Sequence, residues 1–227
     1  MTFSIVARCP DRGMFGVAVS SSSPAVGARC AHARAGVGAV ASQNITDPAL
    51  GGTILDGMAQ GQSAAQALTG ALSQTPYGAY RQLLVVGRRD PPVIHSGAHA
   101  LGIVAAATGP DGAAAGNLLA HAEVPAAMLE AFSSSAGHLA ARLLTALRAG
   151  VDRGGEAGPL HSASVLVVGE PSWPIVDLRL DWTEGNPVTE LWAIWDLYAP
   201  QIDDYIRRAK DPGSAPRFGV PGETAKP

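Results

Sequence analysis

Thr2 is the residue whose type and position best suit nucleophilic chemistry. It follows Met1, and a small second residue allows an aminopeptidase to remove that methionine. The hydroxyl of an N-terminal threonine is a weak nucleophile, but the α-amine of the same residue can accept its proton. This amine has a reference pKa of about 7.7–8.0, so a useful fraction is neutral near pH 7. Met-Thr is also a common start in proteins without such chemistry, where the threonine is only an exposed first-strand residue.

A β-hairpin is predicted to fix the direction of the Thr2 hydroxyl. Residues 3–7 alternate in the manner of a strand that begins at the terminus. Residues 9–13 contain Pro, Asp and Gly, which is turn chemistry, and residues 15–19 return as a second strand. That strand ends in four serines beside Thr2, so Ser21 is a candidate to orient the α-amine. A run of four serines is more often a polar loop.

Composition bounds the class of protein. Hydrophobic residues make up 47% of the 227 residues and charged residues 15%, which is enough for a substantial core. The net charge of −3 predicts neither nucleic-acid nor membrane binding. Two cysteines without metal-ligand spacing, and no basic-then-apolar leader, predict a reduced, cytoplasmic setting with no metal or cofactor.

The remaining elements alternate between strands and helices. We predict one domain over residues 1–210, followed by a disordered tail over 211–227 that is rich in Pro and Gly. Further strands are predicted at 37–41, 83–86, 93–96, 103–108, 162–168 and 175–182. Helices are predicted at 53–74, 122–134 and 138–150, and a last one starts at Asn186. Strands before, between and after blocks of helix favour a layered α/β protein.

Several stretches in order resemble a bacterial family of unknown function, domain of unknown function 1028, which is placed among the N-terminal-nucleophile (Ntn) hydrolases. They include Thr2–Arg8, Gly16–Val19, Pro24–Gly27, Ala33–Val40, Tyr80–Gln82, Gly116–Ala120, Ser162-Ala163 and Val176–Asp181. The resemblance implies a four-layer αββα sandwich of two antiparallel sheets. It implies amide hydrolysis only by analogy, since fold does not settle function.

The chain departs from the family pattern at three places near strand ends. Ser20–Ser23 replaces the usual Ala-Ser, basic and aromatic residues, Asn44-Ile45 replaces Ala-Phe, and His161 replaces Gln. A pocket would be lined at such positions. The changes therefore predict either an altered substrate or a site that no longer works.

Five further residues are candidates for the site, each with a structural alternative. Gln43 and Asn44 close a strand, where an amide can donate to an oxyanion or cap the next helix. Asn117 follows an apolar segment and is a candidate oxyanion or substrate contact, or a turn residue. Arg81 can bind a substrate carboxylate or pair with a surface acid. His161 is a candidate substrate-binding or acid–base residue, or a hydrogen-bonded structural histidine.

These residues predict a hydrolase of a small amide-, amidine- or peptide-like C–N bond, with Thr2 as nucleophile after loss of Met1. An internal nucleophile, one of the four serines or Cys30, is a rival within the same chemistry. The alternative from another class is a non-catalytic small-molecule-binding or assembly protein on the same scaffold. Trp192 and Trp195 on the last predicted helix either pack on a sheet or meet a second subunit, from which we expect a homodimer.

Overall fold

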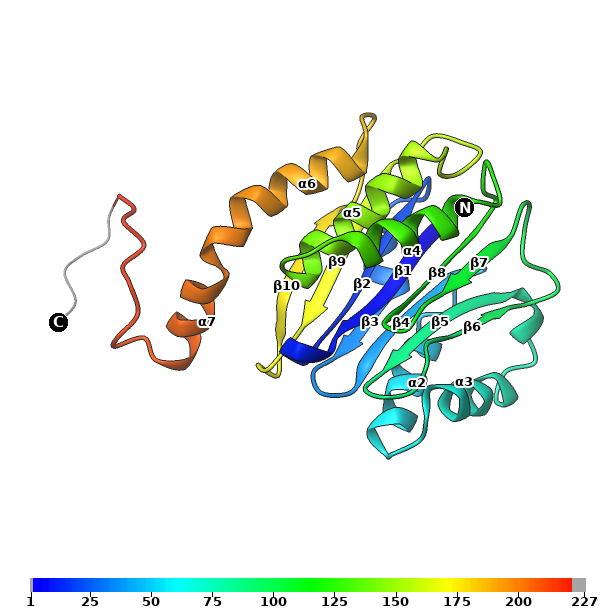
Figure 1. Cartoon of the computed structure of the whole chain (residues 1–227), viewed down its shortest axis with the longest axis horizontal. Helices are drawn as coiled ribbons and strands as arrows, with labels where there is room; N and C mark the ends of the chain where they lie inside the picture. The colour runs from blue at the N-terminus through cyan, green and yellow to red at the C-terminus, as the bar shows by residue number, and fades with distance from the viewer. Residues whose placement is uncertain (1, 222–227) are drawn as a thin grey trace.

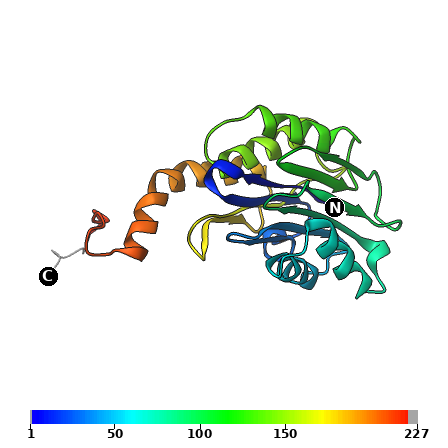
Figure 2. The ribbon, with the colours of Figure 1, turned by 60° about the horizontal axis from the view of Figure 1, so that its bottom comes forward.

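Two antiparallel sheets lie face to face between helices in the computed structural model, which describes residues 2–221 (Figures 1 and 2). Within these residues the larger sheet has six strands, in the order β10 (Pro174–Leu180), β9 (Ser162–Val168), β2 (Met14–Ser21), β1 (Thr2–Cys9), β8 (Gly112–Asn117) and β7 (Ala105–Thr108). The smaller sheet orders four strands as β3 (Ala31–Arg34), β4 (Gly38–Asn44), β5 (Arg81–Gly87) and β6 (Val93–Ser96). The predicted opening hairpin is confirmed as β1 and β2, which pair antiparallel.

Helices cover the outer face of each sheet. Two of them, α4 (Val124–Ser134) and α5 (Leu139–Asp152), lie on the larger sheet, with α6 (Pro187–Tyr198) beside them over β9 and β10. On the smaller sheet lie α2 (Ala49–Ala59) and α3 (Ala64–Ser73). The short α1 (Val26–Cys30) joins the sheets, and α7 (Ile202–Lys210) follows α6 away from them (Figure 1). The order helix, sheet, sheet, helix confirms the predicted αββα sandwich.

Alternation along β1 divides its side chains between two environments. Phe3 and Ile5 point to the outer face and pack in the core under α4 and α5. Val6 belongs to the apolar cluster between the sheets, and Ser4 bonds across to the smaller sheet. Because successive side chains of a strand point to opposite faces, Thr2 shares the inter-sheet face with Ser4 and Val6.

The single helix predicted over residues 53–74 is wrong, because two helices occupy this region. The chain turns at Gly61, whose φ of +94° is unfavourable for other residues. A capping box then starts α3: the Ser63 hydroxyl accepts from the Gln66 N–H, and the Gln66 side chain accepts from the Ser63 N–H. Both helices bury their apolar residues in one cluster, which explains the continuous periodicity in the sequence.

Residues 112–117 form β8, a strand that is absent from the sequence prediction. The run Gly112–Gly116 is made of Gly and Ala, which have low strand propensity. The segment forms a strand because it pairs with β1 on one side and β7 on the other. This pairing fixes the position of Asn117 directly opposite Thr2.

The C-terminal part of the chain is described as far as residue 221. Residues 211–221 contain no helix or strand, and Arg208 of α7 donates to carbonyls of Pro216 and Arg217. Residues 222–227 of the predicted disordered tail lie outside the described residues.

Trp195 is buried with the core under α5, and Arg148 lies over the ring of Trp192. The predicted homodimer and single domain stay predictions. In the described part of the chain, every helix is too short or too polar to cross a membrane.

Candidate active site

The space between the sheets is apolar at one end and polar at the other. Alternation along β1, β2, β4, β5 and β8 brings polar side chains together where β1 begins. They are Thr2, Ser4, Ser21, Gln43, Gln82 and Asn117, and all are at least 95% buried. Buried polar groups are stable only when they are hydrogen-bonded, and the members of this polar cluster bond to one another.

Thr2 and Ser21 bring their hydroxyl groups together at the end of the hairpin. The register pairs Phe3 with Ser20, so Ser21 lies beside Thr2 on the same face. The two hydroxyl oxygens are 3.3 Å apart, and either can be the donor. The Ser23 N–H also donates to the Ser21 hydroxyl at 3.1 Å, which fixes the serine side chain. The structure thus places Ser21 next to Thr2, as the sequence predicts.

Gln43 links β1 of the larger sheet to the centre of the smaller sheet. Its Oε1 accepts from the Ser4 hydroxyl at 2.7 Å. Its Nε2 donates to Gln82 Oε1 at 2.8 Å and to the Ala115 carbonyl at 3.2 Å. A carbonyl only accepts, so the amide nitrogen of Gln43 must face Ala115. The orientation of this side chain is therefore determined by its surroundings.

The same reasoning orients Gln82 and then Asn117. Gln82 Nε2 donates to the Gly116 carbonyl at 3.1 Å and to the Ser96 hydroxyl at 3.0 Å, so its Oε1 must be an acceptor. Asn117 Nδ2 donates to this Oε1 at 3.1 Å. Asn117 Oδ1 is buried and has no hydrogen-bond partner among residues 2–221. Beside Thr2, the network thus presents an unused acceptor and an amide whose direction is fixed.

Glu156 is a buried carboxylate at the edge of this cluster, and it is 4% exposed. Both of its oxygens accept from the Ser22 N–H, each at 3.2 Å. Burial raises the pKa of Glu156 to about 7, against the positive charge of the chain's amino terminus, the Ser22 hydrogen bonds and His161, which lower it. A carboxyl with such a pKa carries a proton part of the time near neutral pH.

Sequence reasoning missed Glu156, Ser4 and Gln82. Glu156 lies in the run Gly154-Gly155-Glu156-Ala157-Gly158, which reads as an exposed loop. Ser4 had a usable signal, because it shares the strand period of Thr2. Gln82 follows Arg81 in a stretch already singled out, and the alternation of a strand could have separated the two.

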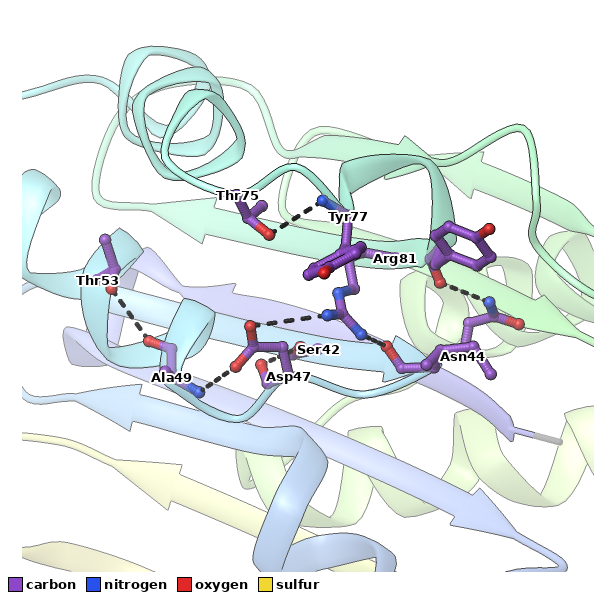
Figure 3. A network of polar contacts seen from close by, with 10 residues as sticks. Ser42, Asn44, Asp47, Ala49, Thr53, Thr75, Tyr77 and Arg81 are labelled. Atoms are coloured by element: carbon purple, nitrogen blue, oxygen red, sulfur yellow. Dashed lines mark hydrogen bonds and ion pairs between the residues drawn. The ribbon is translucent and has the colours of Figure 1, made fainter.

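Arg81 and Asn44 lie outside the polar cluster, on the outer face of the smaller sheet (Figure 3). The Arg81 guanidinium donates to the Ile45 carbonyl and lies 3.8 Å from Asp47. Asn44 Nδ2 donates to the Tyr80 carbonyl at 2.6 Å, with its backbone in the left-handed region at φ +73°. Both side chains thus hold the loops around β4 and β5, and the structure does not bring them to Thr2.

His161 lies between Ser21 and the start of β9. Its backbone N–H donates to the Ser21 carbonyl at 2.9 Å, and its ring Nδ1 lies 2.7 Å from the Thr183 carbonyl. The ring stacks on Trp182, with centroids 4.1 Å apart. Nδ1 must carry a proton to bond a carbonyl, which leaves Nε2 as an acceptor in the neutral ring. His161 therefore borders the polar cluster through its backbone.

Other features of the described residues lie away from Thr2. A surface pocket of about 470 Å³ is lined by residues that include Val37, Met58, Arg88 and Arg89, at the opposite ends of β4 and β5. Burial raises the pKa of the Cys30 thiol, which disfavours the thiolate needed for attack. Within residues 2–221, no three His, Cys, Asp or Glu side chains are grouped as a metal site requires.

Comparison with known proteins places the chain in a family without assigning an activity. No curated protein matches the sequence. Protein SPO2555 from Silicibacter pomeroyi, a solved structure of family DUF1028, is 31% identical with a TM-score of 0.82, over 89% of this chain and 94% of that one. The Thiobacillus denitrificans protein BPH, solved with epoxomicin, is 16% identical with a TM-score of 0.41, over 75% of this chain and 100% of that one, a likeness too low to carry an argument. The family of unknown function DUF1028 matches residues 2–191, and the chain belongs to it.

Proposed function

We propose that this protein hydrolyses a small amide-, amidine- or peptide-like C–N bond, with Thr2 as its N-terminal nucleophile. The observation that carries the proposal is the position of the Thr2 hydroxyl. It starts a central strand of the larger sheet, lies 3.3 Å from the Ser21 hydroxyl and faces the oriented amides between the sheets. A nucleophile held in a fixed position and direction reacts faster, because less entropy is lost when the transition state forms.

The mechanism requires that Met1, which lies outside the described residues, is removed. The Thr2 hydroxyl then attacks the substrate carbonyl while the Thr2 α-amine takes its proton. The resulting ammonium returns the proton to the leaving nitrogen, and water hydrolyses the acyl-enzyme. Ser21 supports this arrangement, because its hydroxyl contacts Thr2 Oγ1 and is itself fixed by Ser23.

Asn117 is the candidate contact for the oxyanion. It pairs directly with Thr2 across β1 and β8, and the bond to Gln82 uses one N–H of its amide. The second N–H can donate to an oxyanion, and the unused Oδ1 can accept from a substrate N–H. A donor oriented before the reaction begins costs no reorganisation in the transition state.

The pocket near Arg88 and Arg89 favours the second candidate function, non-catalytic binding of a small molecule. Its two arginine residues suit a ligand that carries a carboxylate or phosphate group. A ligand at a hundred times its Kd would stabilise the fold by about 2.7 kcal/mol. A thermal-shift screen with small anions therefore tests this alternative without reference to Thr2.

Intact mass of the protein expressed without an N-terminal tag is the first test of hydrolysis. We expect a mass short of one methionine, and one covalent adduct with a β-lactone probe. Thr2→Ala should abolish the adduct and Thr2→Ser should retain it, because serine keeps the hydroxyl. Thr69→Ala on the exposed face of α3 is the matched control and should label like the wild type. Retained Met1, or an adduct that survives Thr2→Ala, would remove the proposed mechanism.

A further inference from the structure

The start of β1, at Thr2, lies between the segments that follow the two neighbouring strands. Ser22 follows the last residue of β2, and Leu118 and Leu119 follow the last residue of β8, with Leu118 in the left-handed region at φ +51°. Residues 155–157 pair with the segment after β8. The Ala120 N–H donates to the Gly155 carbonyl, and the Ala157 N–H donates to the Leu118 carbonyl, both at 3.0 Å. Glu156 is thereby held opposite Leu119.

From this position the Glu156 side chain reaches across the line of β1. Its backbone pairs with Leu119 after the end of β8, whereas its carboxylate accepts from the Ser22 N–H after the end of β2. Strand β1 lies between β8 and β2, so the Glu156 side chain spans the end of β1 that carries Thr2. In a chain that starts at Thr2, the α-amine is the first group of β1 at this end of the sheet.

We propose that Glu156 is a positioning residue whose carboxylate accepts a hydrogen bond from the α-amine of Thr2 and directs that amine toward Thr2 Oγ1. The proposal rests on the proposed function, since it concerns the base of that same reaction. A hydrogen bond to the carboxylate restricts the rotation of the amine about the N–Cα bond. An amine so restricted keeps its lone pair near the hydroxyl proton that it must accept.

The electrostatics of Glu156 agree with this geometry. The positive charge of the amino terminus, which in the full-length chain belongs to Met1, lowers the pKa of the carboxyl, against the larger effect of burial. His161 is the other charged group that acts on it, in the same direction. In a chain that starts at Thr2, an ionised Glu156 carboxylate beside the α-amine would stabilise the protonated amine and raise the pKa of that amine.

The test measures the pKa of the α-amine and needs no substrate. The full chain is released from an N-terminal fusion by a protease that leaves Thr2 first, which makes the test independent of Met1 removal in the cell. The rate of α-amine acetylation by acetic anhydride is followed by mass spectrometry across the pH range. Glu156→Gln should lower the pKa of the amine by about one unit or more, because it removes an opposite charge at close range.

Two further variants keep the result interpretable. Glu156→Asp withdraws the carboxylate by one methylene and should shift the pKa of the amine in the same direction by less. Glu123→Gln, an exposed residue just before α4, should leave it unchanged. An unchanged amine pKa in the folded Glu156 variants would overturn the proposal. A shifted pKa in a protein that never hydrolyses or labels would uphold the position of Glu156 and reject the hydrolase.

Discussion

The raised pKa of Glu156 predicts that replacing this carboxylate stabilises the protein at neutral pH and above. Its pKa is about 7 in the folded protein, against 4.5 in a solvated reference. A group whose folded pKa is raised contributes stability that is complete below the unfolded pKa and is lost as pH rises through the folded value. The wild-type protein should therefore lose stability through Glu156 between about pH 4.5 and about pH 7.

The size of the effect follows from the two pKa values. At about 1.4 kcal/mol for each pH unit, the gap between 4.5 and about 7 corresponds to about 3–4 kcal/mol. Other groups also titrate in this range, so the free energy of unfolding of the wild type alone is not diagnostic. The difference between Glu156→Gln and the wild type cancels these other groups. This difference should move in favour of the variant by about 2–3 kcal/mol from about pH 5 to about pH 8.

Urea unfolding followed by tryptophan fluorescence at several pH values measures this difference directly. Glu123→Gln is the control, because Glu123 is exposed and its replacement should change the free energy of unfolding little. A Glu156→Gln difference that stays flat between about pH 5 and about pH 8 would refute the reasoning. It would mean that the carboxyl is solvated in the folded protein, or that its partners fully compensate for its burial.

Three other predictions concern the surroundings of the site. Gln82→Met removes four hydrogen bonds at a buried position, to Gln43, Ser96, Gly116 and Asn117. Urea unfolding should show that this variant is destabilised by at least about 3 kcal/mol. The control Gln74→Met, at an exposed position of the same residue type, should change the free energy of unfolding little. Arg81→Met should cost about 1–3 kcal/mol of stability but leave β-lactone labelling of Thr2 unchanged, because its contacts lie on the outer face; lost labelling in a folded variant would contradict this. Cys30 should react with iodoacetamide near neutral pH only after unfolding, since burial raises the pKa of its thiol, and fast modification of the native protein would count against that burial.

Sequence reasoning placed Thr2 and Ser21 together because a hairpin is a local structure. The turn residues and the alternation of both strands are visible within the first 23 residues, and they fix the register. The sandwich came from a resemblance of many stretches in order, and no single pattern would have given it. Local patterns and chain order were thus enough for the position of the candidate nucleophile.

The other half of the site depends on contacts between distant parts of the chain. Gln43 meets Ser4 across 39 residues, and Glu156 meets Ser22 across 134. Such pairs leave no periodic signal in one sequence. Arg81 was predicted as a site residue. The residue of this stretch that faces the space between the sheets is, however, its neighbour Gln82. A shift of one residue along a strand exchanges its two faces.

The backbone carbonyls that fix Gln43 and Gln82 also limit how the site can adapt. Each amide could reverse only by placing an oxygen against the carbonyl of Ala115 or Gly116, which is repulsive. The Gln43 and Gln82 amides, the floor of the candidate site, therefore have one arrangement of donors and acceptors and cannot rearrange for a different ligand. Relatives that act on different molecules would have to diverge in the surrounding loops, such as the serine run after β2, while this floor stays the same. Selection for new specificity is thereby directed to segments whose change leaves the core intact.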